Sequence, residues 1–258
     1  MHTLITGASA GIGLELARVF ASHNHDLVLV ARNEASLRSL ADELRTTYGV
    51  DAVVLSADLS TPETPGLIHD FCAQHRLDVD ILVNNAGFGD YGAFHELDRQ
   101  RQLDMIAVNI TSLADLTHRF LPDMVKRGRG KVMNVASTAA FQPGPFMSVY
   151  YATKAFVLHF SEAISVELEG TGVTVTALCP GATHSEFQER ANLNGSRLFD
   201  GRTLPTSMDV ALYGYEATMR GKRVAIHGLL NAILANSVRF SPRGVVLRIA
   251  RFIQSKKN

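Results

Sequence analysis

Seven short runs of apolar and β-branched residues alternate with helix-like stretches, and this alternation limits the possible folds more than any other feature of the sequence. The runs are His2–Thr6, Leu27–Ala31, Ala52–Ser56, Ile81–Asn84, Lys131–Val135, Val173–Leu178 and Val224–His227. Most of the helix-like stretches lie between them: Gly13–Ser22, Glu34–Tyr48, Gly66–His75, Asp98–Lys126 and Val149–Glu169. Apolar strands separated by helices form a parallel sheet covered on both faces, and right-handed crossovers make it doubly wound. We predict a single α/β domain over residues 1–258 with a seven-stranded parallel sheet.

The first strand leads directly into a glycine-rich turn, Thr6–Gly13, and then into a helix. Glycines permit a tight turn and remove Cβ atoms that would block the approach of a pyrophosphate, and the helix start offers free N–H groups to it. The spacing differs from the commoner Gly-x-Gly-x-x-Gly, so the evidence is the place of the turn between a strand and a helix. We expect a dinucleotide to contact Gly7, Ser9, Ala10, Gly11, Ile12 and Gly13.

Ser9 also opens an alternative, because Gly7–Gly11 matches the Gly-x-Ser-x-Gly turn that carries the nucleophile of α/β-hydrolases. That turn needs an oxyanion loop from an earlier strand, and no strand is predicted before His2–Thr6, the strand that leads into this turn. We therefore favour Ser9 as a turn residue over Ser9 as a nucleophile.

The end of the second predicted strand carries Arg32 in place of the acid that usually binds a ribose 2′-hydroxyl. A guanidinium can hold a 2′-phosphate by paired, charge-assisted hydrogen bonds, whereas a carboxylate would repel it. The sequence thus favours NADP(H) over NAD(H).

Tyr150 and Lys154 lie four residues apart in a predicted helix, so the phenol and the ammonium can face one pocket. A nearby cation favours the ionised phenol and so lowers its pKa. Tyr151 has no lysine four residues on and is the weaker candidate. Ser137 follows the fifth strand and can orient a substrate oxygen; Ser148 is closer in sequence but less well placed.

These features occur in a recognisable order: the Thr6–Gly13 turn, Asp58, Asn84–Gly87, Asn109, Ser137, Tyr150-x-x-x-Lys154 and Pro180-Gly181. Over nearly its whole length the sequence resembles the classical short-chain dehydrogenase/reductase (SDR) family. The resemblance implies a Rossmann fold and an NADP(H)-dependent oxidoreductase that transfers hydride between nicotinamide and a carbonyl or secondary alcohol. It also implies a homodimer or homotetramer, often paired through the helix Val149–Glu169.

The resemblance further implies roles for individual residues. Tyr150 would be the general acid/base, Lys154 would lower its pKa and bind the nicotinamide ribose, Ser137 would orient the carbonyl, and Asn109 would hold a water in a proton relay. Cofactor contacts would come from the following: Arg32, Asp58, Leu59, Asn85, Ala86, Gly87, Tyr150, Lys154, Pro180, Gly181 and Thr183. A non-catalytic dinucleotide-binding sensor or scaffold is the alternative; the intact Ser137, Tyr150 and Lys154 count against it.

Composition narrows the class of protein. Twenty-five basic and 25 acidic residues cancel, so no global charge suggests a nucleic-acid partner. Cys72 and Cys179 have no metal-type spacing and cannot form a disulfide framework, which fits a cytoplasmic protein. None of the ten histidines shows a ligand pattern, and we expect no metal. No signal peptide or membrane span is expected.

The loops after the strands should set substrate specificity. An apolar cleft for a lipophilic ketone or aldehyde is expected from Phe88, Tyr91, Phe141, Phe146, Met147, Phe187, Leu193 and Phe199, with His184 a further lining candidate. Residues 182–220 form the substrate loop, within which Asn192–Arg202 has the composition of a mobile lid.

The C-terminal segment, residues 242–258, has basic residues beside five apolar residues at helical spacing: Val245, Val246, Ile249, Phe252 and Ile253. This pattern predicts an amphipathic helix that either packs its apolar stripe on its own domain, which we favour, or contacts an anionic membrane or a partner.

Overall fold

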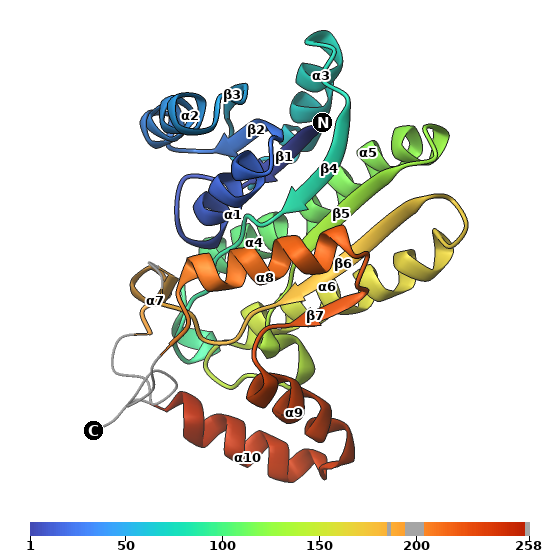
Figure 1. Cartoon of the computed structure of the whole chain (residues 1–258). Helices are drawn as coiled ribbons and strands as arrows, with labels where there is room; N and C mark the ends of the chain where they lie inside the picture. Colours follow the sequence, from blue (N-terminus) through green and yellow to red (C-terminus); the bar gives the residue numbers. More distant parts are fainter. Residues whose placement is uncertain (185–186, 194–203, 256–258) are drawn as a thin grey trace.

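The computed structural model describes residues 1–184, 187–193 and 204–255, and its centre is one parallel sheet in the order β3-β2-β1-β4-β5-β6-β7 (Figure 1). The strands are β1 His2–Thr6, β2 Asp26–Ala31, β3 Ala52–Ser56, β4 Val79–Asn84, β5 Gly130–Val135, β6 Val173–Cys179 and β7 Val224–Ile226. Each overlaps a predicted strand. The predicted doubly wound, seven-stranded fold is confirmed.

Strand β1 lies in the middle of the sheet and pairs with β2 on one side and β4 on the other. The strand order reverses between β1 and β4, so the connections leave in opposite directions and open a crevice beyond the carboxyl ends of these strands. The glycine-rich turn after β1 and the loop after β4 therefore meet at the same place.

Helices cover both faces of the sheet (Figure 1). The principal helices have these bounds: α1 Gly11–Ser22, α2 Glu34–Tyr48, α3 Thr64–Gln74, α4 Arg99–Ile106, α5 Leu113–Lys126, α6 Ser148–Glu167, α7 Phe187–Arg190, α8 Ser207–Met219, α9 Leu229–Ser237 and α10 Arg243–Gln254. Short 3₁₀ turns are η1 Phe94–Glu96, η3 Thr138–Phe141 and η5 Val238–Phe240. One apolar core lies under α1, α2 and α8, and a second lies under α3, α5 and α6.

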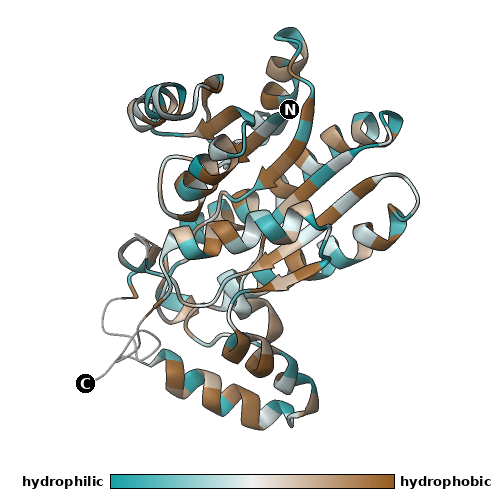
Figure 2. Ribbon diagram, in the orientation of Figure 1, coloured by the Kyte–Doolittle hydropathy of each residue, from teal (hydrophilic) through white to brown (hydrophobic). Residues whose placement is uncertain are grey.

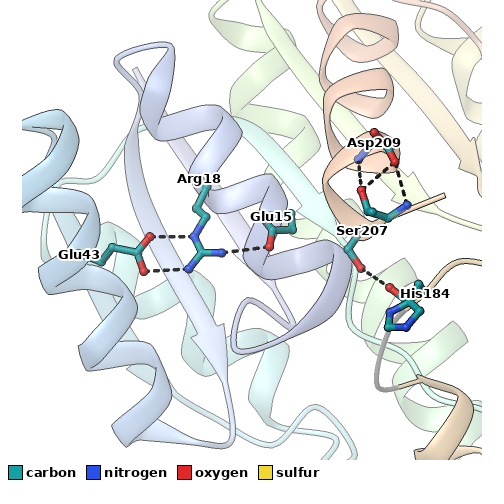
Figure 3. Close-up of polar contacts among 7 residues, drawn as sticks. Glu15, Arg18, Glu43, His184, Ser207 and Asp209 are labelled. Carbon is teal, nitrogen blue, oxygen red and sulfur yellow. Dashed lines mark hydrogen bonds and ion pairs between the residues drawn. The ribbon is translucent and has the colours of Figure 1, made fainter.

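Arg18 ties α1 to α2 beside the glycine-rich turn (Figure 3). Its guanidinium donates to both carboxylate oxygens of Glu43 on α2, at 2.7 and 2.9 Å, and to Glu15 on its own helix at 3.0 Å. The two-pronged contact with Glu43 fixes the orientation of a planar guanidinium, so it helps to fix the helix whose start borders the crevice.

The stretch Asp98–Lys126, predicted as one helix, is interrupted. Helices α4 and α5 are separated by a π-helical turn, η2 Ala107–Ser112, which contains Asn109. The Asn109 side chain bonds the backbone of Phe88 on a neighbouring loop, and this long-range contact holds the wider turn. Helical periodicity did not reveal the insertion.

Residues 182–220 hold more regular structure than the predicted loop. They include α7 and α8, and α8 begins with Thr206 and Asp209 bonding each other's backbone N–H groups, while Ser207 donates to the His184 carbonyl at 3.3 Å (Figure 3). Most of the predicted lid Asn192–Arg202, including Phe199, lies outside the described residues.

The predicted C-terminal helix is present, but the prediction that its apolar stripe packs on the domain is wrong. Val245, Ile249, Phe252 and Ile253, four of the five apolar residues of the predicted stripe, are 38–64% exposed. Together with α9, a helix not predicted from the sequence, α10 forms the end of the molecule below β7 (Figures 1 and 2). No helix within the described ranges is long and apolar enough to cross a membrane.

Candidate active site

A cleft of about 1040 Å³ opens beyond the carboxyl ends of the strands. The sequence-predicted residues on its wall are Gly7, Ser9, Ala10, Gly11, Ile12, Arg32, Asp58, Leu59, Asn85, Ala86, Gly87, Ser137, Tyr150, Lys154, Pro180, Gly181 and Thr183. Gly13 and Asn109 do not line it, because each is buried behind the wall. Nearly all of the predicted site residues are therefore brought together.

The glycine-rich turn packs against the loop after β4 too closely for side chains. Gly7 has a φ of +67°, and a Cβ there would lie 2.9 Å from the Ala86 Cα. A Cβ on Gly13 would lie 2.2 Å from the Gly7 carbonyl oxygen. Asn85 donates its amide to the carbonyls of Thr6 and Gly7 at 2.9 and 3.2 Å, so its side chain holds the turn in place.

The start of α1 is open towards the cleft. Its N-cap, Ala10, has an extended backbone and no capping side chain, and the first turn has no acidic residue. The first N–H groups of the helix therefore keep their hydrogen-bonding capacity and the positive end of the helix dipole. A close-fitting glycine cradle beside such a helix start fits the pyrophosphate of a dinucleotide.

Arg32 lies at the rim of the same end of the cleft. Its side chain is 76% exposed, and a guanidinium nitrogen lies 3.9 Å from a carboxylate oxygen of Asp58. Asp58 is held in turn by the backbone N–H and hydroxyl of Ser60, each at 2.9 Å. The arginine thus keeps donors available at the position where a ribose phosphate would lie.

Ser137, Tyr150 and Lys154 meet between β5 and α6. The Ser137 hydroxyl is a hydrogen-bond partner of the Tyr150 phenol and also accepts from the Ala139 N–H at 3.1 Å. Lys154 donates through Nζ to the Val135 carbonyl at 2.8 Å, and its Nζ lies 5.8 Å from the centroid of the Tyr150 ring. The spacing of four residues on α6 places the phenol and the ammonium on one face, as predicted.

The electrostatics of this group differ from the expected pattern. Burial raises the pKa of Tyr150 by more than the Ser137 hydrogen bond lowers it. Burial also lowers the pKa of Lys154 to about 8. The predicted lowering of the Tyr150 pKa by Lys154 is not found in this structure, because desolvation outweighs the favourable contacts of the phenolate. At neutral pH Tyr150 is a protonated phenol, the form that can donate a proton.

Asn109 lies behind this group and is 1% exposed. Its amide donates to the Phe88 carbonyl and the Thr153 hydroxyl, both at 3.0 Å, and its carbonyl accepts from the Phe88 N–H at 3.1 Å. A Cβ on Gly87 would lie 3.0 Å from the Asn109 Oδ1 and 3.4 Å from the Lys154 Nζ. A side chain at Gly87 would therefore crowd the Asn109 carbonyl and contact the Lys154 ammonium.

The substrate end of the cleft is apolar. Its cluster contains Ala139, Met147, Tyr151, Ala191 and Leu193, with Tyr91, Tyr150 and Phe187 packed against it. Of the predicted lining residues, Phe88, Met147, Phe187 and Leu193 line the cleft. Tyr91 packs against the cluster without lining the cleft, and Phe199 falls outside the described residues. Phe141 packs in a separate core cluster, Phe146 packs against Tyr91 with centroids 5.8 Å apart, and His184 is exposed outside the cleft wall.

Three further residues shape this end and were missed. A Cβ on Gly89 would lie 2.9 Å from the Phe187 ring, and one on Gly144 would lie 2.2 Å from the Tyr151 ring, so both glycines make room for aromatic rings. Gln254, at the end of α10, is 2% exposed and accepts a hydrogen bond from the Tyr91 phenol at 2.9 Å through its backbone carbonyl. A glycine in a loop rich in aromatic residues is a sequence signal that could have indicated Gly89 and Gly144. No local sequence pattern indicates Gln254.

Comparison with known proteins agrees with this geometry. The family model described as short chain dehydrogenase matches residues 1–195. The chain belongs to the short-chain dehydrogenase/reductase family. It is therefore an oxidoreductase that uses a nicotinamide dinucleotide and acts on a small molecule.

Similar SDR proteins include two curated relatives. A 7β-hydroxysteroid dehydrogenase of Collinsella aerofaciens is 33% identical over 180 residues, which cover 70% of this chain and 68% of the relative. A very-long-chain 3-oxoacyl-CoA reductase of Laccaria bicolor is 35% identical over 177 residues, which cover 68% of this chain but only 52% of the relative. The solved short-chain dehydrogenase of Sphingobium yanoikuyae in complex with NADPH is 33% identical, with a TM-score of 0.84, and the match covers 95% of this chain and 94% of that one.

Proposed function

We propose that the protein is an NADP(H)-dependent carbonyl reductase or alcohol dehydrogenase for lipophilic ketones, aldehydes or secondary alcohols. The observation that carries this proposal is the position of Ser137, Tyr150 and Lys154. They lie on a cleft wall that runs from the glycine-rich turn to the apolar cluster around Met147. A nucleotide in the first part and a carbonyl compound in the second would meet at the Tyr150 phenol.

When bound, the nicotinamide supplies a hydride to the carbonyl carbon or accepts one from the alcohol carbon. In the reductive direction Tyr150 donates its phenolic proton to the carbonyl oxygen, and in the oxidative direction the phenolate takes the proton back. Ser137 donates a hydrogen bond to the same oxygen and orients it. Lys154 stabilises the phenolate, and Asn109, which like Lys154 lies beside Gly87, holds the water through which the proton is replaced.

The preference for NADP(H) is part of the proposal. It is supported by the exposed Arg32 guanidinium at the cleft rim and by the absence of an acid at the end of β2. A competing carboxylate, Asp58, lies 3.9 Å from Arg32, but a 2′-phosphate carries more charge and can accept two parallel N–H bonds.

The lipophilic substrate is supported by the aromatic and aliphatic wall, since apolar walls with few polar groups bind apolar ligands. Two relatives are named for a hydroxysteroid and for a very-long-chain oxoacyl thioester, both largely hydrocarbon. We infer a substrate of the same general character, with a carbonyl or hydroxyl that reaches Tyr150 and an apolar body against Phe187.

The hydrolase alternative loses support in the structure. Among the described residues no histidine lines the cleft that contains Ser9, so the hydroxyl has no general base of the usual kind there. A non-catalytic sensor would need no proton donor in the cleft, so the hydrogen-bonded pair Ser137 and Tyr150 counts against that alternative.

The proposal also covers the oligomeric state and the cellular location of the protein. Phe156 and Val166 on α6 are 39% and 52% exposed, which supports a homodimer or homotetramer paired through that helix. Both cysteines are buried and free, which supports a cytoplasmic location.

The test is a titration of the purified protein with NADPH and NADH by fluorescence, followed by turnover of a series of ketones and 3-oxoacyl thioesters of increasing chain length. We expect tighter NADPH binding and a KM that falls as the chain lengthens. Turnover with NADH alone would overturn the cofactor assignment. Binding of both nucleotides without turnover of any carbonyl compound would favour the sensor.

A further inference from the structure

The C-terminal hairpin, defined here as α9, η5 and α10 (residues 229–254), has its apolar side turned away from the domain. In α9, Leu229, Leu230, Ile233 and Leu234 are 51–80% exposed, whereas the small Ala235 is buried. A surface helix normally buries its apolar stripe and exposes its polar one. In this helix the large apolar side chains are exposed instead, and the brown colour of α9 in Figure 2 marks its apolar composition.

Helix α10 has the same reversed orientation. Ala250 and Gln254 are the buried residues of this helix, while Val245 and Ile249 are 40% and 54% exposed. Phe240, between the two helices, is 89% exposed. The hairpin thus exposes large apolar side chains on both helices and on the turn between them, at one end of the molecule (Figure 1). Exposed apolar surfaces of this kind usually mark a contact site.

The charge of this segment has one sign. Residues 229–258 contain six of the 25 lysines and arginines of the chain and none of its 25 aspartates and glutamates. Four of these, Arg239, Arg243, Arg248 and Arg251, lie in the hairpin and are exposed. In the described part of the chain, no ion pair joins any of them to a carboxylate. An apolar face flanked by unpaired arginines matches the interface of an anionic lipid bilayer.

A second copy of the chain fits this surface less well. In a twofold contact of the hairpin with itself, the same arginines would face one another across an apolar interface without acidic partners. An anionic lipid surface supplies an apolar layer for the exposed apolar side chains. It also supplies negative charge for the arginines, and the hairpin itself has no acidic residue.

The hairpin is also joined to the substrate end of the cleft. Gln254 accepts a hydrogen bond from the Tyr91 phenol through its backbone, and its side chain bonds the Tyr151 phenol. Both tyrosines belong to the apolar cluster beside Tyr150. A surface that bound to the hairpin would therefore lie next to the end of the cleft that receives the substrate.

We propose that the C-terminal hairpin docks the protein on an anionic lipid bilayer, with Leu230, Ile233 and Ile249 entering the headgroup region and the arginines contacting lipid phosphates. This docking goes beyond the proposed oxidoreductase function and does not depend on it, because the binding surface contains no residue of the catalytic group.

The test is co-sedimentation of the full chain with vesicles made of equal parts phosphatidylcholine and phosphatidylglycerol, compared with vesicles of phosphatidylcholine alone. We expect binding to the mixed vesicles that is roughly tenfold stronger than to the neutral ones and that weakens with added salt. Equal binding to both vesicles, or no binding to either, would overturn the proposal.

Two matched variants distinguish vesicle binding through the hairpin from non-specific binding through any exposed apolar side chain. Leu230 on α9 and Leu67 on α3 are 61% and 64% exposed. Leu230→Asp should reduce vesicle binding roughly tenfold, because it removes an inserted side chain and adds a repelled charge, whereas Leu67→Asp should leave it unchanged. An equal loss in both variants would refute the assignment to the hairpin.

If the hairpin instead joined two copies of the chain, the same Leu230→Asp variant would change the oligomeric state. If Leu230→Asp lowers the oligomeric state in sedimentation velocity, the hairpin is an interface between copies and the lipid proposal fails. We expect the oligomeric state of Leu230→Asp to equal that of the unmodified protein. Arg248→Glu combined with Arg251→Glu should likewise keep the oligomer and lose the preference for phosphatidylglycerol.

Discussion

Replacing Lys154 with methionine removes a buried ammonium group from the cleft and should stabilise the folded protein at neutral pH. Lys154 is 5% exposed, and burial lowers the pKa of its ammonium from 10.5 to about 8. Since one pKa unit corresponds to about 1.36 kcal/mol, keeping the charged form in the folded protein costs about 3 kcal/mol at pH 7. Methionine fills a similar volume without a charge and avoids this cost.

The size of the effect depends on pH. Below pH 8 the folded and unfolded chains both hold the proton, so the cost is fully present. Between pH 8 and 10.5 the folded chain loses the proton and the unfolded chain keeps it, so the unmodified protein becomes more stable as pH rises. The stability advantage of Lys154→Met should therefore shrink by about 2 kcal/mol between pH 7 and pH 9.5. Loss of the Nζ bond to Val135 lowers the variant's stability by about 1 kcal/mol at both pH values, without changing this trend.

The assay is urea unfolding followed by circular dichroism at pH 7 and pH 9.5, on protein free of nucleotide. Lys126→Met, at an exposed position on α5, is the control and should show no such trend. A difference in unfolding free energy between Lys154→Met and the unmodified protein that stays constant with pH would refute the account of Lys154 as a desolvated ammonium.

Other predictions concern the two ends of the cleft. Gly13→Ala places a Cβ 2.2 Å from the Gly7 carbonyl oxygen and should weaken NADPH binding at least tenfold by fluorescence titration, whereas Gly244→Ala, with no atom within 4 Å, should bind normally. Arg32→Asp should reverse the ratio of NADPH to NADH affinity, and an unchanged ratio would make Arg32 a surface residue only. Phe187→Ala should raise the KM of long-chain substrates several-fold and leave that of short-chain ones unchanged, because it removes apolar wall beyond the reacting carbonyl; a uniform change across chain lengths would contradict this.

The parts of this structure that follow from local patterns could be predicted from the sequence. The sheet follows from short, continuous apolar runs separated by helix-like stretches. The positions of Tyr150 and Lys154 on one helix face follow from the period of 3.6 residues. The glycine-rich turn and the loop after β4 meet because the carboxyl ends of neighbouring parallel strands share one edge of the sheet.

Features that depend on contacts between distant segments could not be predicted. The π-helical turn at Asn109 is tied to the backbone of Phe88, and Gln254 reaches the cleft through Tyr91, 163 residues away in the chain. The apolar stripe of α10 was visible in the sequence, but periodicity does not say which way such a stripe faces. The pKa of Tyr150 depends on total burial, and the lysine four residues away is not enough to estimate it.

The most direct test of the central claim, that Tyr150 transfers the proton, is the turnover of Tyr150→Phe beside that of Tyr151→Phe, with NADPH affinity measured for both. The account predicts that Tyr150→Phe binds NADPH normally and loses about 10²–10⁴-fold in kcat, because it lacks the proton donor, while Tyr151→Phe keeps kcat within a few-fold. Full turnover by Tyr150→Phe, or an equal loss in both variants, would contradict the assignment of Tyr150 as the general acid.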